Sequence, residues 1–201
     1  MAARDDGHTE RLVRCGVSRS QTTTAAIVRA ATRVFRARGY RNTSLADLAA
    51  ATGLTKGAFY HHFRDKAAVM AAVLAEATAY AKTEVFARVA DEGLGLDERL
   101  GAMVSGAERL FAGGPGGCLF ANTALETSGV DDRFLPLVRA FVDAWRDALA
   151  SLARDAGHAA PEAAAERVVA DVEGAIVLMR LYGDRAYLDR ALARVGPTLL
   201  P

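Results

Sequence analysis

The chain has 201 residues, and 51% of them are apolar, so it can bury one large or two small hydrophobic cores. Its two cysteines make neither a disulfide framework nor a metal-ligand cluster, and no uninterrupted apolar run approaches the length that spans a bilayer. We therefore expect a soluble, cytoplasmic chain with no cofactor, no metal and no membrane partner.

Charge is distributed unevenly along the chain. Residues 1–66 carry twelve Lys and Arg against five acidic side chains, which gives this part +7. The whole chain is formally +1, so residues 67–201 carry −6. A basic end on an acidic remainder is typical of a protein that docks one end on phosphates.

The N-terminal third begins with a polar arm and a long helix. Residues 1–19 are polar and charged without periodicity, and are predicted to be a flexible basic arm. Over residues 20–38, apolar side chains recur at helical spacing, and Gly39 follows at the position where a helix commonly ends. The outer face of this predicted helix carries three arginines: Arg29, Arg33 and Arg36.

Residues 43–66, TSLADLAAATGLTKGAFYHHFRDK, predict two short helices joined by a tight turn. Ser44, with Asp47 three residues later, forms a capping box for a helix over 45–51. Gly53 then supplies the positive φ that a tight turn between helices needs.

The second short helix is predicted over 56–63, with Thr55 as its cap. Phe59 and Phe63 are spaced to point inward. The opposite side carries groups that can touch DNA, namely Lys56, Gly57, Tyr60 and His61. The two helices together have the pattern of a helix-turn-helix whose second helix enters a major groove.

These residues resemble the TetR family of transcriptional regulators, and the resemblance covers residues 20–70. It is carried by Thr43, Leu48-Ala49, Gly53-Leu54-Thr55, Phe59-Tyr60, His62-Phe63 and Asp65-Lys66, which have the order and spacing of that family. The resemblance implies a three-helix DNA-binding head over residues 20–66 and a helical body over residues 67–201 that binds an effector and forms a homodimer.

The resemblance also implies roles for individual residues of the head. Phosphate contacts are expected from Thr43, Tyr60, His62 and Lys66, and base contacts from the start of the second helix at Thr55, Lys56, Gly57 and His61. Lys56 is a candidate donor to guanine N7 and O6. The arm residues Arg11, Arg14 and Arg19 either reach along a neighbouring groove or remain solvated, and Arg41 is either a further phosphate contact or free.

The body is predicted to be entirely helical, so the fold class is all-α. The helix that starts after Asp65 should bury a stripe of Val69, Val73, Ala77 and Tyr80. The remaining breaks, at Gly and Pro, define helices over 65–90, 97–111, 118–127, 131–156, 161–181 and 187–195.

The last two predicted helices have apolar stripes suited to a dimer interface of two helices from each subunit. The stripes consist of Val168, Val172, Ala175, Ile176 and Met179, then Leu188, Ala191, Leu192 and Val195. The alternative is that these residues bury within the monomer. A homodimer would present two recognition helices to the two half-sites of a pseudo-palindromic operator.

Aromatic and thioether side chains of several helices are candidates to line a pocket for an apolar or aromatic effector: Phe86, Met103, Phe111, Phe120, Trp145 and Tyr182. The alternative for each of these residues is that it is plain core.

Cys118 lies in a Gly-Cys-Leu-x-x-Asn segment that resembles one branch of the family, in which repressors sense electrophiles through cysteine. A thiol in the first turn of a helix favours the thiolate, whereas a buried packing residue is the alternative.

We interpret the chain as a ligand-responsive DNA-binding regulator, with repression as the expected sign. A cysteine switch through Cys118 is the alternative within regulation. A helical-bundle enzyme is the alternative from another class, but the sequence has no paired catalytic carboxylates, nucleophile elbow, metal cluster or phosphate loop. A scaffold that uses the head for protein contacts disagrees with the charge distribution.

Overall fold

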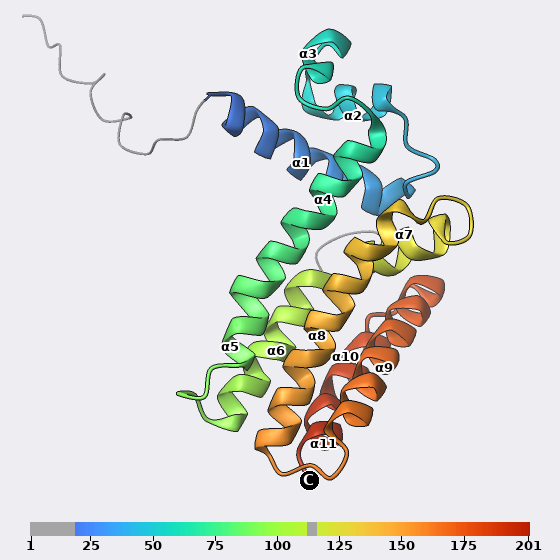
Figure 1. Ribbon diagram of the computed structural model, residues 1–201. Coiled ribbons are helices and arrows are strands. Elements are labelled where there is room, and N and C mark those ends of the chain that lie inside the picture. Colours follow the sequence, from blue (N-terminus) through green and yellow to red (C-terminus); the bar gives the residue numbers. More distant parts are fainter. Residues whose placement is uncertain (1–18, 112–115) are drawn as a thin grey trace, which may run out of the picture.

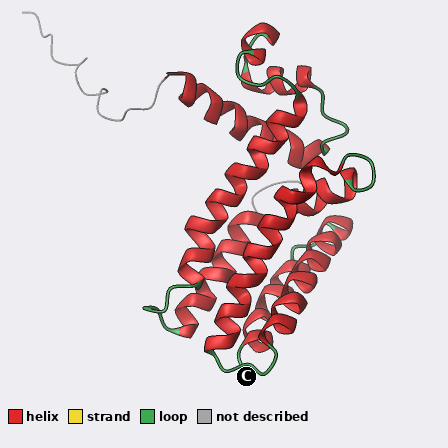
Figure 2. Cartoon of the chain, in the orientation of Figure 1, coloured by secondary structure: helices red, strands yellow, loops and turns green. Residues whose placement is uncertain are grey.

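The computed structural model describes residues 19–111 and 116–201. Within these ranges every regular element is a helix (Figure 2), which confirms the all-α class. A small head stands at one end of a longer helical body (Figure 1). No helix in the described ranges is long and apolar enough to cross a membrane.

The head consists of three helices: α1 (Arg19–Arg38), α2 (Leu45–Thr52) and α3 (Lys56–Tyr60). Gly39 ends α1 with a φ of +80°, and Gly53 ends α2 with a φ of +69°, both in the left-handed region that favours glycine. The capping box of α2 is confirmed, because the Ser44 hydroxyl accepts from the Asp47 N–H while the Asp47 carboxylate accepts from the Ser44 N–H.

The inner faces of the head helices meet in one hydrophobic core. Ile27 and Phe35 of α1, Leu48 of α2 and Phe59 of α3 are at most 1% exposed. Full burial of a side chain of this size contributes about 1.5–3 kcal/mol. Since α3 has only one and a half turns, this burial of Phe59 fixes its position in the head.

One long helical segment connects the head to the body. It comprises α4 (Lys66–Ala81), the π-helical turn η1 (Lys82–Phe86) and α5 (Ala87–Val89). The predicted extent of 65–90 is therefore right, but the helix is not regular. Val85 in the π turn packs over Gly106, where a Cβ would collide with it. The predicted buried stripe also fails at its last member, because Tyr80 is 42% exposed.

The remaining body elements are α6 (Leu96–Phe111), α7 (Leu119–Thr127), the 3-10 turn η2 (Asp132–Phe134), α8 (Leu135–Asp155), α9 (Pro161–Tyr182), α10 (Ala186–Ala193) and α11 (Val195–Leu199). Two differences from the prediction concern boundaries. Cys118 is the N-cap of α7 and precedes its first turn. The last predicted helix is interrupted at Arg194 and continues as α11 to Leu199.

The body is tied together by apolar burial and by an ion pair between a buried arginine and an exposed aspartate. Arg99 of α6 is 3% exposed, and its guanidinium donates to the Val89 carbonyl and, over 2.7 Å, to the Asp155 carboxylate. The buried guanidinium thus has two acceptors, as a buried charge requires, while the Asp155 carboxylate stays in contact with solvent. The contact joins the end of α5, the start of α6 and the end of α8.

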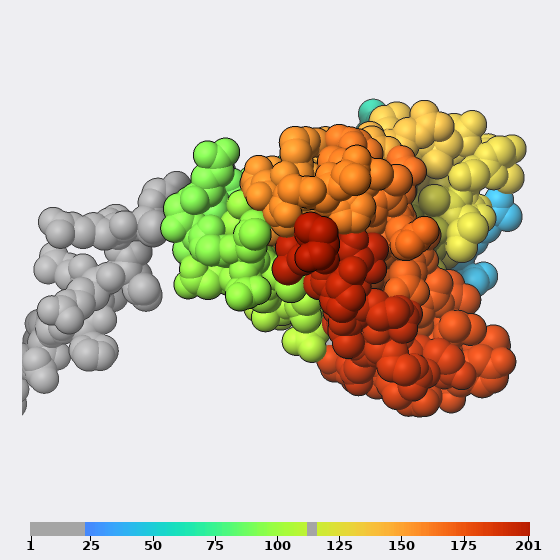
Figure 3. All heavy atoms as spheres, turned by 90° about the horizontal axis from the view of Figure 1, so that it is seen from below, coloured from blue at the N-terminus to red at the C-terminus, as the bar shows by residue number. Residues whose placement is uncertain are grey.

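The predicted dimer stripes pack within the monomer. Val168, Val172, Ala175 and Ile176 of α9, and Leu188, Ala191, Leu192 and Val195 after it, are at most 5% exposed. They contact α8 and each other, and the C-terminal helices form one flank of the molecule in the view from below (Figure 3). The opposite side of α9 is also apolar and is exposed: Gly174, Val177, Leu178, Leu181 and Tyr182. Helical periodicity identified the first of these faces, but not whether it packs within the monomer or against a second subunit.

Among the described residues, the head contacts the body through side chains at three places beside the covalent path through α4. The Arg36 guanidinium donates to the Leu110 carbonyl near the end of α6. Glu126 of α7 accepts from the Arg41 N–H over 2.8 Å. The ring of Tyr40 meets that of Phe134 edge-on, with 5.0 Å between centroids. All three involve the last turn of α1 or the segment that follows it.

Candidate functional site

The recognition helix α3 is presented on the outside of the head. The Thr55 hydroxyl accepts from the Ala58 N–H over 3.2 Å and so caps the helix. The helix ends at Tyr60 and not at Phe63 as predicted, because the N–H groups of His62 and Phe63 both donate to the Phe59 carbonyl and close a tight final turn. Phe63 is nevertheless buried, as expected.

Most of the predicted base-reading residues lie on the exposed surface of this helix. Lys56, Gly57 and His61 are exposed together with Thr55, and Tyr60 is 44% exposed. Apart from its chain neighbours and its own helix backbone, no described residue has an atom within 4 Å of the place that a Cβ on Gly57 would occupy, so a partner can approach the backbone closely there. One exposed surface thus presents the Lys56 and His61 side chains, the Tyr60 hydroxyl and the open backbone at Gly57.

Two predicted phosphate contacts, His62 and Lys66, are partly buried and support the head from within. The Nδ1 atom of His62 lies 3.0 Å from the Thr24 hydroxyl of α1. The Lys66 ammonium donates to the Tyr40 carbonyl over 2.8 Å and lies 4.3 Å from the centre of the Tyr40 ring. Burial lowers the pKa of Lys66, and the charge of Glu126 opposes that shift.

Thr43 is placed differently from the expectation. Its side chain is 2% exposed, and its hydroxyl donates to the Gly39 carbonyl over 2.7 Å. The hydroxyl therefore stabilises the turn between α1 and α2 and does not face outward to a phosphate. Arg41 in the same turn is exposed, and Arg11 and Arg14 of the arm lie outside the described residues.

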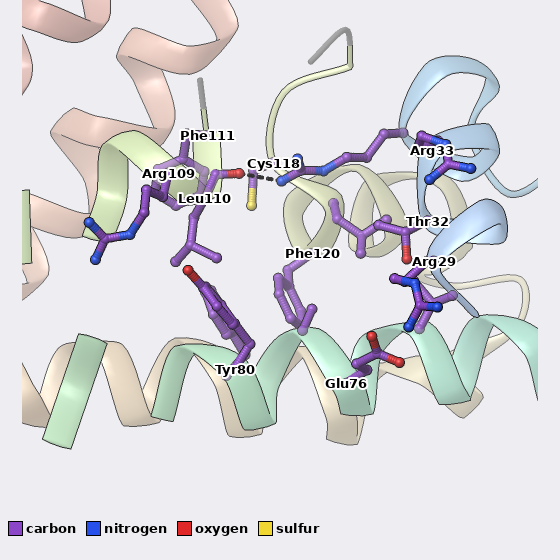
Figure 4. Close-up of a pocket in the computed structure, with 15 residues that line it drawn as sticks. Arg29, Thr32, Arg33, Glu76, Tyr80, Arg109, Leu110, Phe111, Cys118 and Phe120 are labelled. Atoms are coloured by element: carbon purple, nitrogen blue, oxygen red, sulfur yellow. Dashed lines mark hydrogen bonds between the residues drawn. The ribbon is translucent and has the colours of Figure 1, made fainter. Parts of the chain in front are cut away.

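A cavity of about 330 Å³ lies where α1, α4, α6 and α7 meet (Figure 4). Its floor is apolar, from Val73, Phe111, Cys118, Leu119, Phe120 and Phe141, all buried. Its remaining wall carries Arg29, Thr32, Arg33, Arg36, Glu76, Ala77, Tyr80, Arg109 and Leu110. The volume falls in the range of small-molecule sites, roughly 300–1,000 Å³.

The predicted pocket residues separate into three groups. Phe111, Cys118 and Phe120 line this cavity. Phe86, Met103 and Trp145 lie beside it around a void of about 10 Å³, which is too small for any ligand larger than a water, so they belong to the core. Tyr182 is far from both, because it ends α9 on the exposed face and stacks on Tyr187 with 5.5 Å between ring centroids.

The prediction missed the arginines of the cavity. Arg29, Arg33 and Arg36 follow one another at helical spacing and were assigned to a solvated outer face of α1. The signal was present as a basic stripe at i, i+4 and i+7. The sequence does not show what lies across the cavity from that stripe, namely α6 and α7 of the body, because this depends on packing between segments far apart in sequence.

Cys118 is buried between α7 and α9, and its thiol is not activated. It is 2% exposed, its Sγ accepts from the Ala121 N–H over 3.5 Å, and it shares a hydrogen bond with the Glu173 carboxyl. Burial, and then the charge of Glu173, raise the pKa of the thiol well above its ordinary value. Of the two alternatives drawn from the sequence, the structure agrees with the buried packing residue, because desolvation outweighs the effect of the helix start.

No cluster of three or more His, Cys, Asp or Glu side chains that could hold a metal ion occurs among the residues the structure describes. The two features with the composition of binding sites are thus the exposed surface of α3 and the cavity under α1. A helix-turn-helix head on a helical body defines a class: DNA-binding proteins that place a recognition helix in a major groove.

Comparisons with known proteins identify the family within this class. Residues 27–73 match the model described as bacterial regulatory proteins, tetR family, and residues 97–195 match that of the tetracyclin repressor-like C-terminal domain. The chain belongs to the TetR family and is a helix-turn-helix transcriptional regulator, not an enzyme.

Individual relatives agree with this assignment. The chain is 29% identical over 185 residues to the HTH-type transcriptional repressor DhaR of Mycobacterium sp. (strain GP1), covering 87% of this chain and 91% of that protein. It is 44% identical over 63 residues to the HTH-type transcriptional regulator TtgR of Pseudomonas putida, covering 31% of this chain and 30% of TtgR. A TetR-family regulator from Cytophaga hutchinsonii superposes with a TM-score of 0.75 at 28% identity, covering 92% and 96% of the two chains.

The burial of Cys118 predicts that its thiol reacts slowly with a thiol reagent. In a Cys15→Ser variant, where Cys118 is the only thiol, reaction with Ellman's reagent at pH 7.5 should be at least about a hundredfold slower in the folded protein than in the same variant unfolded in urea, since the thiolate is the nucleophile. Equal rates in the two states would contradict the buried, protonated thiol and restore the cysteine switch.

Proposed function

We propose that this regulator is a repressor that binds a pseudo-palindromic operator as a homodimer and releases it when a small molecule occupies the cavity under α1. The observation that carries the DNA-binding half is the exposed row of Thr55, Lys56, Tyr60 and His61 on a short helix whose position is fixed by buried Phe59. Regulators of this kind gain specificity from two such helices in adjacent major grooves.

Within each head, we assign the reading of bases to the start of α3 and the phosphate contacts to its margin. Lys56 donates to guanine N7 or O6, and Gly57 lets the backbone approach the groove. Tyr60 and Arg41 contact phosphates, while Lys66 and His62 orient the helix from behind. Thr43 supports DNA binding indirectly, by stabilising the turn between α1 and α2.

The dimer is proposed to form through the exposed apolar face of α9 in place of the stripe predicted from sequence. Val177 is 58% exposed, Leu181 is 70% exposed and Tyr182 is 64% exposed. Val177 and Leu181 line a groove together with Leu125 of α7, which is 81% exposed. A contiguous apolar patch of this kind marks an interaction site, and a second copy of the same face suits a two-fold interface.

Release is proposed to follow from a change in how the head sits on the body. The cavity is bounded by α1 of the head and by α6 and α7 of the body, so an occupant contacts both. A ligand that binds one head orientation better than another shifts the population toward it. If that orientation spaces the two α3 helices wrongly for adjacent grooves, the operator dissociates.

The DNA-binding surface is tested by removing single groups from α3. Lys56→Ala should weaken binding to an operator selected from random duplexes by about ten- to a hundredfold, on the order of 1–3 kcal/mol, because a base contact is lost. Arg88→Ala, which removes the same charge from exposed α5 at the end of the body away from the head, should leave the affinity unchanged in the same fluorescence-anisotropy titration. Unchanged affinity in Lys56→Ala and in Tyr60→Ala would contradict the assignment.

The dimer face is tested by charge on α9. Leu181→Glu should convert the protein from a species of twice 21.2 kDa to a monomer in light scattering after size exclusion, because two like charges would be buried at the two-fold axis. The control is Ala159→Glu, which places the same charge on an exposed loop. A Leu181→Glu protein that stays dimeric would place the interface elsewhere.

A further inference from the structure

The cavity under α1 is cationic at its mouth and apolar at its floor. Four arginines line it, Arg29, Arg33, Arg36 and Arg109, against a single acidic side chain, Glu76. Arg29, Arg33 and Arg109 are exposed and have no ion-pair partner among the described residues. The close-up shows Arg29 and Arg33 beside α1 and Arg109 on the opposite side (Figure 4). This part of the wall therefore presents uncompensated positive charge to an occupant.

The fourth arginine is only partly satisfied. The terminal nitrogen of Arg36 donates to the Leu110 carbonyl, but its Nε is buried and has no hydrogen-bond partner among the described residues. A buried unpaired donor costs about 1–3 kcal/mol. A guanidinium that has unused donors is suited to the planar, two-oxygen geometry of a carboxylate.

The floor opposite these charges suits a flat hydrocarbon. Phe120 and Phe141 stack with 3.7 Å between their centroids and only 4° between their planes, and Phe111 lies beside them. Tyr80 extends from α4 toward Leu110 (Figure 4). The cavity therefore has aromatic rings at its floor and arginines at its mouth.

We propose that the effector is an amphipathic organic anion, an aromatic or similarly apolar carboxylate whose hydrocarbon part lies on the phenylalanine floor and whose carboxylate is held by the α1 arginines. This rests on the proposed function, since it gives the chemistry of the same effector site. It narrows the apolar or aromatic effector expected from the sequence, because a neutral hydrocarbon would leave the arginine cluster without a counter-charge.

The test is a calorimetric comparison of two probes of the same shape, 2-naphthoate and its neutral amide 2-naphthamide, on the unaltered full-length protein. The carboxylate should bind at least tenfold more tightly, about 1.4 kcal/mol. In the Arg29→Gln, Arg33→Gln double variant that preference should vanish while the affinity for the amide stays the same. Arg38→Gln, on the same helix but paired with Asp47 outside the cavity, should keep the preference.

A second variant tests the proposal independently, in case the arginine double variant does not fold. Glu76→Gln removes the one acidic group of the lining and should tighten 2-naphthoate severalfold without changing the amide. Equal affinities of the two probes for the unaltered protein, no binding of either, or a preference that survives the double variant would overturn the proposal. Operator binding by the unaltered protein without either probe tests the proposed function separately, so the two can fail independently.

Discussion

The close approach of the last turn of α1 to the body is the constraint on which the rest of the structure depends. Gly116 has a φ of +118°, and a Cβ there would collide with the Arg36 carbonyl, so only glycine allows the two segments to meet. The Arg36 side chain makes the reciprocal contact with the Leu110 carbonyl. This approach holds the last turn of α1 against the end of α6, where Arg36 and Leu110 both line the cavity.

The same turn is connected to the proposed dimer helix through α7. The Asn122 amide donates to the Gly116 carbonyl and accepts from Arg180 of α9 over 3.3 Å, while Glu126 accepts from the Arg41 N–H. α7 thus contacts the head at one side and α9 at the other. Since Cys118, the cap of α7, lines both the cavity and the groove beside α9, a ligand, the dimer face and the DNA-reading head share one short element. Coupling between sites requires such an element with two arrangements.

Local features of this fold were predictable from sequence, and features that depend on packing were not. The capping box at Ser44, the left-handed Gly53 and the inward Phe59 follow from residue chemistry and spacing within one turn. The packed face of α9 could not be chosen, because both of its faces are apolar. Thr43 was expected to contact a phosphate, and the sequence left Cys118 open between a sensor and a packing residue, but burial in the folded chain decides the state of both. The arginines of α1 were visible as a stripe, while the aromatic floor opposite them comes from α6, α7 and α8.

The central claim is that occupation of the cavity and binding of the operator are coupled through the head. The direct measurement is the affinity of the protein for its selected operator, by fluorescence anisotropy, with and without 2-naphthoate at a concentration that calorimetry shows to saturate the cavity. The account predicts that the operator dissociation constant rises at least tenfold, and that the operator weakens 2-naphthoate by the same factor, as thermodynamic linkage requires. An operator affinity that is unchanged while 2-naphthoate is bound would contradict it.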